Sequence, residues 1–372
     1  MKITILSTAY PLRGGIAHFI GLLYKELIKR HEVNVVTFKR QYPSIFFPGK
    51  SQLEGGETSE KIPSEISVDS VNPFNWIRTG LKIKKDAPDL LIYKYWMPFF
   101  GPCFGTISKI ARRNRRTKVL VICDNVIPHE KKPGDITFTK YFFRSADYFV
   151  LLSEKVREDL LLLKPSAVNN VLPHPVYSNF GQPVPKEEAR KYLKLKDDKL
   201  ILFFGFIRDY KGLDVLLSAM TFLKNKLDVK LIVAGEFYSN KEKYLNLIKE
   251  LNLTESVHLF TDFIPTSDVK YYFSAADSVI LPYRDATQSG IVQIAVNFKK
   301  PVIATDVGGL SEVIREGETG YIVPKENPPA LAEAVLKFYS ELDEKKFTEN
   351  IEKEAAKYSW ENFVNGINDL IH

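Results

Sequence analysis

The segment from Pro282 to Pro324 limits the possible folds of this chain more than any other stretch. Its pattern predicts a strand, a polar loop with a glycine, a helix, a second strand, a Gly-Gly turn and a second helix. Strands that alternate with helices in this way are typical of a parallel α/β sheet. We therefore expect an α/β protein that binds its ligands in the loops after the strands.

The loop Thr287-Gln288-Ser289-Gly290 opens the first of these helices. The first N–H groups of a helix lack partners and the helix dipole is positive there, so this loop favours an anion site. Gly308-Gly309 repeats the arrangement one strand later. The alternative is that both are ordinary strand-to-helix turns, because glycine is common in turns of every kind.

The N-terminal part of the chain begins with the same order of elements. It predicts an apolar strand at residues 2–7, a loop with Gly14 and Gly15, an amphipathic helix to about Arg30 and a strand at residues 33–37. This is the start of a doubly wound sheet, but the G-x-G-x-x-G spacing of dinucleotide sites is absent. The glycine pair either lets the backbone approach a ligand closely or makes a tight turn.

A polar cluster follows the buried strand predicted at residues 119–123. It contains Asp124, Asn125 and His129, and its position beyond a strand end is well placed for chemistry. The alternative is a structural histidine in an ordinary loop, which is the commoner role of a lone histidine.

Two cations follow the strand that ends at Gly205. Arg208 and Lys211 stand at the carboxyl end of this strand and before a helix, an arrangement that suits a diphosphate. The alternative is a surface loop with two ordinary charges.

The net charge of +7 is unevenly spread, with a basic segment at residues 109–118. An aromatic loop predicted at residues 95–102 precedes it, and residues 40–76 are predicted to form a long binding loop. Aromatic rings beside cations suit an anionic membrane surface. The alternatives are a solvated helix end beside buried rings, or nucleic acid. No helix-turn-helix, zinc or RNA-recognition pattern accompanies the charge, so we expect no nucleic acid.

The length of 372 residues favours two domains. We expect them at residues 1–175 and 176–357, because Pro173-His174-Pro175 makes a stiff break and because residues 144–153 and 273–282 resemble one another. No apolar stretch reaches the roughly 20 residues of a membrane span, and the N-terminus lacks a signal-peptide pattern. The two cysteines give no disulfide framework and no metal spacing. We expect a cytoplasmic protein.

A set of short motifs, in their order and spacing, resembles the family-4 retaining glycosyltransferases (group 1 glycosyl transferases) over nearly the whole chain. The motifs are Gly14-Gly15, Gly205-x-x-Arg208-x-x-Lys211-Gly212, Ala276-Asp277 with Pro282, Pro301-Val302-Ile303-Ala304-Thr305, Gly308-Gly309-x-x-Glu312 and Gly320-Tyr321-x-Val323. The resemblance implies the GT-B fold, in which two Rossmann-like doubly wound parallel-sheet domains face a central cleft. It also implies that the second domain binds the nucleotide-sugar donor, that the first binds the acceptor, and that the C-terminal helix at residues 358–372 packs back on the first.

The resemblance further implies roles for single residues of the second domain. Arg208 and Lys211 would hold the donor diphosphate and stabilise the leaving group, with Gly205 and residues 287–290 around them. Glu312 would bind the ribose hydroxyls. Because these cations and the helix N-terminus offset the phosphate charge, we expect no metal and no other cofactor.

The first domain and one altered motif complete this expected site. Gly14 and Gly15 would close on the phosphates, and His129 with Asp124 and Asn125 would lie near the transferred sugar and the acceptor. The family usually carries a Glu-x7-Glu motif. Here its first Glu is missing, and Gln293 stands at the second position as a catalytic-site residue.

The expected activity is that of a retaining, metal-independent glycosyltransferase of the hexosyltransferase type. It would move a sugar from a UDP- or GDP-sugar to a glycan or lipid-linked acceptor, in cell-surface polysaccharide or glycolipid synthesis. The basic segment at residues 109–118 would hold it on the inner face of the cell membrane. Two alternatives stay open: a UDP-sugar epimerase of the same fold, and a catalytically silent nucleotide-sugar-binding protein, which the missing Glu suggests.

Overall fold

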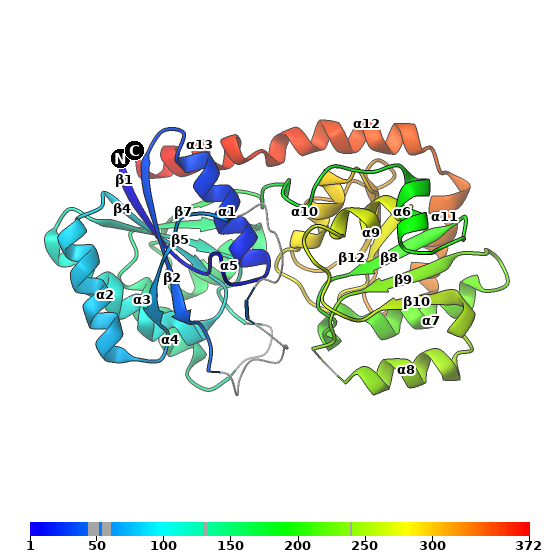
Figure 1. The fold of residues 1–372 in the computed structure, drawn as a ribbon, viewed down its shortest axis with the longest axis horizontal. Helices are drawn as coiled ribbons and strands as arrows, with labels where there is room; N and C mark the ends of the chain where they lie inside the picture. Colours follow the sequence, from blue (N-terminus) through cyan, green and yellow to red (C-terminus); the bar gives the residue numbers. More distant parts are fainter. Residues whose placement is uncertain (44–51, 54–60, 129–131, 239) are drawn as a thin grey trace. The chain divides into compact units, whose positions relative to one another are not determined.

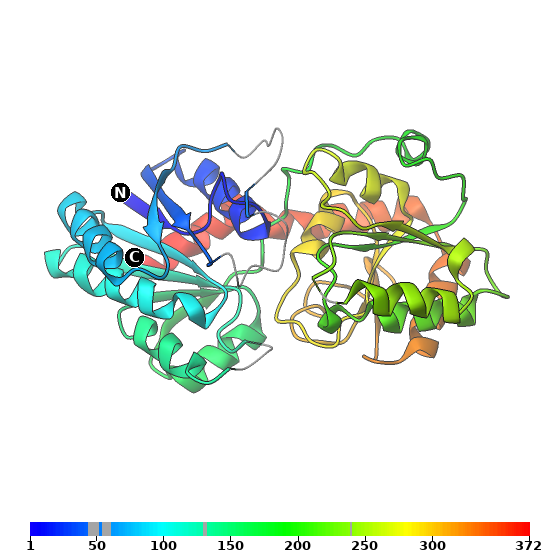
Figure 2. The ribbon, with the colours of Figure 1, turned by 60° about the horizontal axis from the view of Figure 1, so that its bottom comes forward.

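The computed structural model of the chain describes residues 1–43, 52–53, 61–128, 132–238 and 240–372. The fold consists of two compact units, each with its own core. The first unit contains residues 1–175 and 358–372, and the second contains residues 176–357. Each unit is a parallel α/β sheet with helices on both sides (Figures 1 and 2), as the sequence predicts.

The first unit is built on a seven-stranded sheet in the order β3-β2-β1-β4-β5-β6-β7. The strands are β1 (Lys2–Leu6), β2 (Glu32–Arg40), β3 (Glu65–Asp69), β4 (Leu90–Tyr95), β5 (Lys118–Cys123), β6 (Tyr148–Leu151) and β7 (Val168–Val171). The helices are α1 (Gly15–Leu27), α2 (Pro73–Asp86), α3 (Gly101–Ala111), α4 (Asp135–Phe143), α5 (Glu154–Leu163) and α13 (Trp360–Ile371). The central strands are apolar on both faces because helices cover both sides of the sheet.

The second unit has a six-stranded sheet in the order β10-β9-β8-β11-β12-β13. Its strands are β8 (Leu200–Phe204), β9 (Lys230–Ala234), β10 (Val257–Phe260), β11 (Ser278–Leu281), β12 (Val302–Thr305) and β13 (Gly320–Val323). Its helices are α6 (Lys186–Tyr192), α7 (Leu213–Leu223), α8 (Lys241–Glu250), α9 (Val269–Ala275), α10 (Gly290–Asn297), α11 (Pro328–Ser340) and α12 (Glu344–Ala355). The chain reverses its direction of strand addition between β8 and β11, which is where ligands of such sheets bind.

The similar sequences before β6 and β11 have the same structural role. Asp147 accepts a hydrogen bond from the Val119 N–H at 2.9 Å, and Asp277 accepts one from the Leu200 N–H at 2.8 Å. In both units the carboxylate thus satisfies an N–H at the start of the neighbouring strand, Val119 being the second residue of β5 and Leu200 the first of β8. The similarity between residues 144–153 and 273–282 therefore reflects a shared structural feature, an aspartate that binds the backbone of the neighbouring strand.

Helix α13 belongs to the first unit and lies beside α1 (Figure 1). Ser359 caps it, and its apolar face buries Phe363 and Ile367. Phe19 of α1 meets the Trp360 ring at 5.0 Å and the Phe363 ring at 5.7 Å, both edge-on. Helix α13 also packs against the end of β7, where a Cβ on Gly366 would lie 2.4 Å from a Leu172 methyl carbon.

Three local predictions are wrong. Residues 40–76 contain β3 and the start of α2, so the predicted loop is shorter than expected, and its residues 44–51 and 54–60 lie outside the described residues. The aromatic loop at residues 95–102 is core, because Tyr95 ends β4 and Phe100 is buried and stacked on Phe104 at 5.4 Å. The segment after Gly308-Gly309 forms turns in place of a helix. Among the described residues, the helices are all too short or too polar to cross a bilayer.

Candidate functional site

The strongest candidate site lies at the carboxyl ends of β8 and β11 in the second unit. The loop after β8 carries Gly205 and a 3-10 turn at Asp209–Lys211, and the loop after β11 leads to α10. The two loops touch at Gly212, whose φ is +69° and where a Cβ would lie 2.0 Å from the Pro282 carbonyl oxygen. Glycine is needed there because both the backbone conformation and the contact exclude a side chain.

Lys211 is buried beside Gly205. Only 8% of Lys211 is exposed, and a Cβ on residue 205, where φ is +99°, would lie 3.0 Å from Lys211 Nζ. The ammonium also lies 5.6 Å from the centroid of the Tyr283 ring. Within the described part of the chain, no carboxylate pairs with it. Burial, and next the charge of Arg208, lower the pKa of Lys211 to about 7.

Arg208 stands at the other end of the same 3-10 turn and is exposed. Its guanidinium carbon lies 5.4 Å from the Tyr238 ring, which in turn stacks on Phe206 at 4.4 Å. The Lys211 N–H donates to the Arg208 carbonyl at 3.0 Å, so the turn fixes the spacing of the two cations. Two cations lie at one strand end, and one of them is buried without an anionic partner among the described residues. Such a site favours a phosphate-bearing ligand.

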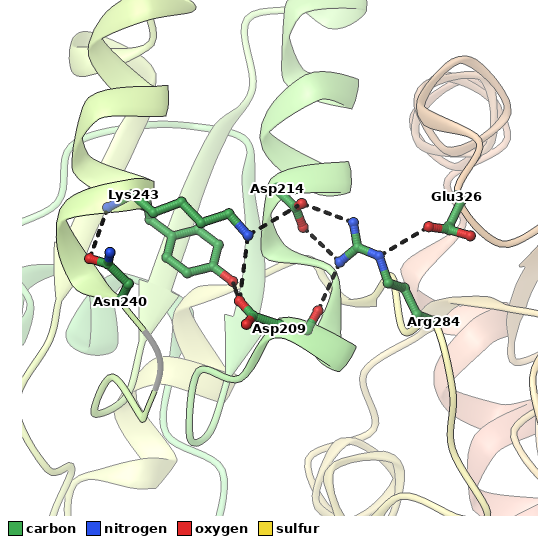
Figure 3. Close-up of polar contacts among 7 residues, drawn as sticks. Asp209, Asp214, Asn240, Lys243, Arg284 and Glu326 are labelled. Carbon is green, nitrogen blue, oxygen red and sulfur yellow. Dashed lines mark hydrogen bonds and ion pairs between the residues drawn. The ribbon is translucent and has the colours of Figure 1, made fainter. Parts of the chain in front are cut away.

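Arg284 is a site residue that the sequence did not reveal (Figure 3). It follows β11, and its guanidinium donates to both carboxylate oxygens of Asp214, at 2.9 and 2.8 Å. It also donates to the Asp209 carbonyl at 2.8 Å and to Glu326 at 3.1 Å. Burial raises the pKa of Asp214, but the bonds from Arg284 outweigh it and the net shift is downward. Arg284 thus ties the 3-10 turn of Lys211 to the loop after β11.

From the other side, α8 supports the same turn. Tyr244 donates from its hydroxyl to the Asp209 carboxylate at 2.9 Å. Lys243 reaches that carboxylate at 3.5 Å (Figure 3). Asn240 caps the helix by accepting from the Lys243 N–H at 3.3 Å. These bonds hold the turn on both sides, so the position of Lys211 does not depend on a bound ligand.

The loop at residues 287–290 leads into α10, so the predicted helix start is confirmed, and Ser289 caps it. Ser289 accepts from the Ile291 N–H at 3.3 Å, and Tyr177 packs against Gly290. Thr287 is buried, and its carbonyl accepts from the Gly309 N–H at 3.2 Å. In the described part of the chain, the buried Oε1 of Gln288 has no hydrogen-bond partner.

The Gly308-Gly309 turn packs against this loop, and the residues described after it form turns, so the helix N-terminus predicted there is not formed. Gly308 has φ +53°, and a Cβ there would lie 1.5 Å from the Ala286 carbonyl oxygen. This glycine is therefore required by contact with backbone. Glu312 is exposed in the turns that follow, and Gln293 is inside α10 with 1% exposure.

In the first unit, the predicted polar cluster is mostly buried. Asp124 forms an ion pair with Lys94 at 2.6 Å, and both are buried. Lys94 Nζ also lies 3.7 Å from the centroid of the Phe19 ring. Burial lowers the pKa of Lys94 and raises that of Asp124, and burial and Lys94 together lower the pKa of His174 to about 3. Asp124 is thus engaged in the core of the unit.

The other predicted site residues of the first unit are Asn125, His129, Gly14 and Gly15, and they differ in burial and conformation. Asn125 follows Asp124 and is half-buried. His129 lies outside the described residues. Gly14 has φ +107° with open space where a Cβ would stand, and Gly15 begins α1. This helix start therefore leaves room for a ligand beside Gly14.

A family model described as "Glycosyl transferases group 1" matches residues 185–371. An uncharacterized glycosyltransferase of Methanocaldococcus jannaschii is 24% identical over 374 residues, which cover 99% of this chain and 97% of that protein. D-inositol 3-phosphate glycosyltransferase of Corynebacterium urealyticum is 31% identical over 193 residues, which cover 50% of this chain and 45% of that protein. The chain thus spans less than half of the length of some curated relatives.

The fold is also similar to that of solved structures. The crystal structure of Anabaena HepE in complex with UDP has a TM-score of 0.77 and 16% sequence identity, and the match covers 100% of this chain and 99% of that one. At this identity the likeness shows the fold alone.

Proposed function

Because the chain belongs to the group 1 glycosyl transferases, a family of enzymes with the GT-B fold, we propose that it moves a sugar from a nucleoside-diphosphate sugar to an acceptor hydroxyl. The single observation that carries this proposal is Lys211, a buried ammonium without a carboxylate partner among the described residues. A buried charge of this kind is costly unless an opposite charge compensates it. A donor diphosphate supplies that charge.

The donor site in this proposal uses the two cations of the 3-10 turn. Lys211 and the exposed Arg208 hold the diphosphate at the end of β8, and the capped start of α10 adds backbone N–H groups. HepE, whose structure was solved with UDP, supports a uridine nucleotide as the first donor to test.

The proposed reaction is retaining and needs no metal. The bond between the anomeric carbon and the departing diphosphate oxygen breaks, and the acceptor oxygen bonds to the same face of that carbon. The acceptor proton passes to the departing diphosphate. Arg208 and Lys211 stabilise the negative charge that grows on this leaving group. Stabilisation of developing charge by fixed groups is usually the largest single contribution to the rate of an enzyme reaction.

The proposed acceptor is a glycan or a lipid-linked sugar of cell-surface polysaccharide or glycolipid synthesis, and the proposed place of work is the inner face of the cell membrane. The basic segment at residues 109–118 supports membrane contact only in part. Arg112 pairs with Asp147 at 2.8 Å and Arg116 pairs with Asp89 at 2.6 Å. These two cations are engaged within the unit, so the segment alone is a weaker lipid site than its sequence suggests.

A thermal-shift panel of UDP, GDP and their sugars, with and without EDTA, tests the donor site. A ligand at about 100 times its Kd should add roughly 2.7 kcal/mol of stability. We expect one nucleotide to stabilise the protein with EDTA present, and Arg208→Ala to remove the effect. Lys226→Ala, which removes an exposed cation of the same unit, should keep it.

Turnover then separates the transferase from its alternatives. Release of UDP or GDP that depends on an added acceptor supports transfer. A nucleotide that binds without any turnover would indicate the silent binding protein, and epimerised donor without acceptor would indicate the epimerase. No stabilisation by any nucleotide contradicts the donor site itself.

A further inference from the structure

Helix α2 presents an apolar stripe to solvent. Phe74 is 83% exposed, Ile77 44% and Leu81 51%. Their spacing of three and four residues places them on one face of the helix. The opposite face packs on α3, where a Cβ on Gly80 would lie 2.8 Å from Ile110 Cβ. Large apolar side chains in a row on an outer face are unusual for a solvated helix.

The start of α2 holds the stripe in place. Asn72 caps the helix by accepting from the N–H groups of Phe74 and Asn75, at 3.0 and 3.3 Å. The Asn75 side chain accepts from the Asp69 N–H at 2.8 Å, and the Trp76 indole donates to the Asp69 carbonyl at 2.8 Å. Phe74 is therefore held outward by a well-bonded helix start attached to β3.

Cations surround the stripe. Arg78, Lys84 and Lys85 are exposed on α2. The 3-10 turn that follows α3 adjoins the end of α2, since Asn114 donates to the Lys84 carbonyl at 3.4 Å, and it adds Arg113 and Arg115. Unlike Arg112 and Arg116, these cations form no ion pair with any residue that the structure describes.

We propose that this docking face binds the surface of an anionic lipid bilayer. We define the docking face by Phe74, Ile77, Leu81, Arg78, Lys84, Lys85, Arg113 and Arg115. The apolar side chains enter the boundary between headgroups and acyl chains, and the cations meet lipid phosphates. The inference rests on the proposed function for its purpose, which is to bring the enzyme to a lipid-linked acceptor.

The charge of the docking face favours a bilayer over a second copy of the chain. In a two-fold contact the same patch lies on both partners, so its unpaired cations would face one another. Nucleic acid would match the cations but leaves the apolar stripe without a partner. An anionic bilayer matches both.

Flotation of the full chain with vesicles tests the proposal. We expect binding to vesicles of phosphatidylcholine with about a third of phosphatidylglycerol, no binding to pure phosphatidylcholine, and weaker binding as salt screens the charges. The triple variant Phe74→Ser, Ile77→Ser, Leu81→Ser should bind about tenfold more weakly or worse. Lys84→Glu with Lys85→Glu should also bind more weakly.

Matched control variants make the same kinds of substitution, of an exposed apolar residue and of exposed lysines, outside the docking face. Leu162→Ser removes a side chain that is 73% exposed on α5, and Lys345→Glu with Lys346→Glu makes the same charge change on α12; both should keep wild-type binding. No binding by the wild-type chain, or undiminished binding by the triple variant, overturns the proposal. A mass in solution that falls from dimer to monomer in the triple variant also overturns it, because the occupant is then a second copy. Donor-induced thermal shifts on the same variants test the donor site separately.

Discussion

Arg284 donates two hydrogen bonds to Asp214, at 2.9 and 2.8 Å, and so joins the loop after β11 to the first turn of α7. The same guanidinium reaches the carbonyl of Asp209, in the 3-10 turn that carries Lys211. Among the described residues, the side chains of this pair bond to Asp209, Lys243 and Glu326, and to none of the predicted donor-binding residues. Its effect on the proposed donor site passes through the backbone of that turn.

Replacing Arg284 should therefore weaken donor binding indirectly. Arg284→Gln removes charged hydrogen bonds worth about 1.5 to 3 kcal/mol each at most, so we expect a loss of about 1 to 3 kcal/mol in urea unfolding and a roughly tenfold weaker Kd for the nucleotide. Asp214→Asn should have a similar effect, and the double variant should cost less than the sum. Glu326→Gln, which removes a partner that is 59% exposed, should change stability by less than about 0.5 kcal/mol. Additive effects of the Arg284 and Asp214 variants would contradict the coupling.

Nucleotide binding should take up a proton through Lys211. Its pKa of about 7 leaves the ammonium mostly neutral at pH 8, and a bound diphosphate favours the charged form. Since phosphate groups are already ionised at pH 8, we expect an uptake of close to one proton per UDP or GDP by calorimetry in buffers of different ionisation enthalpy, and little uptake at pH 6. Lys211→Met should abolish it. An equal uptake by that variant would assign the proton to another group.

The same pKa predicts how the stability of the free protein varies with pH. The folded pKa of Lys211 lies below the ordinary value of 10.5, so between about pH 7 and 10.5 the unfolded chain binds the proton more strongly than the folded one. The contribution of Lys211 to the free energy of unfolding therefore rises with pH across this window. Subtracting the urea-unfolding profile of Lys211→Met from that of the wild type isolates it. A difference that falls with pH would rule out a depressed pKa.

Gly308 should tolerate no side chain, because the backbone of Ala286 lies where a Cβ would stand. Gly317, which also has a positive φ but open space around it, serves as the control. Gly308→Ala adds a Cβ 1.5 Å from the Ala286 carbonyl oxygen at φ +53°, whereas Gly317→Ala adds one in open space at φ +71°. The backbone conformation alone should cost about 1 kcal/mol. We expect Gly317→Ala to lose about that much in urea unfolding and Gly308→Ala to lose at least about 2 kcal/mol more. Equal losses would mean that the loops are not packed together.

The buried ion pair between Lys94 and Asp124 should stabilise the fold and should not take part in the reaction. Removing one member of a buried ion pair costs about 3 to 5 kcal/mol, while replacing both by apolar groups is often neutral. We expect Asp124→Leu to destabilise the chain by that amount and Lys94→Met with Asp124→Leu to recover most of it. If the double variant is stable but has lost turnover, Asp124 acts on substrate and the structural assignment fails.

The sequence predicts the parts of this fold that depend on local pattern. Apolar strands followed by glycine loops and amphipathic helices gave the two sheets, and Gly205 with Arg208 and Lys211 marked the strand end that carries the candidate site. Contacts between distant segments could not be read. Arg284 finds Asp214 70 positions away, and Lys94 sits within an apolar strand where nothing marks its partner. The prediction of a helix after Gly308 is wrong. The glycine stands there because the backbone of Ala286 lies against it, and not because a helix begins.

The final helix has a consequence for synthesis. The apolar side chains of α13 complete the packing around Phe19, yet they leave the ribosome only after the whole second unit has been made. The unit that begins first is thus finished last. Until α13 has been made, the ring of Phe19 lacks its contacts with Trp360 and Phe363, and exposed apolar surface of this kind favours binding by chaperones and cleavage by proteases.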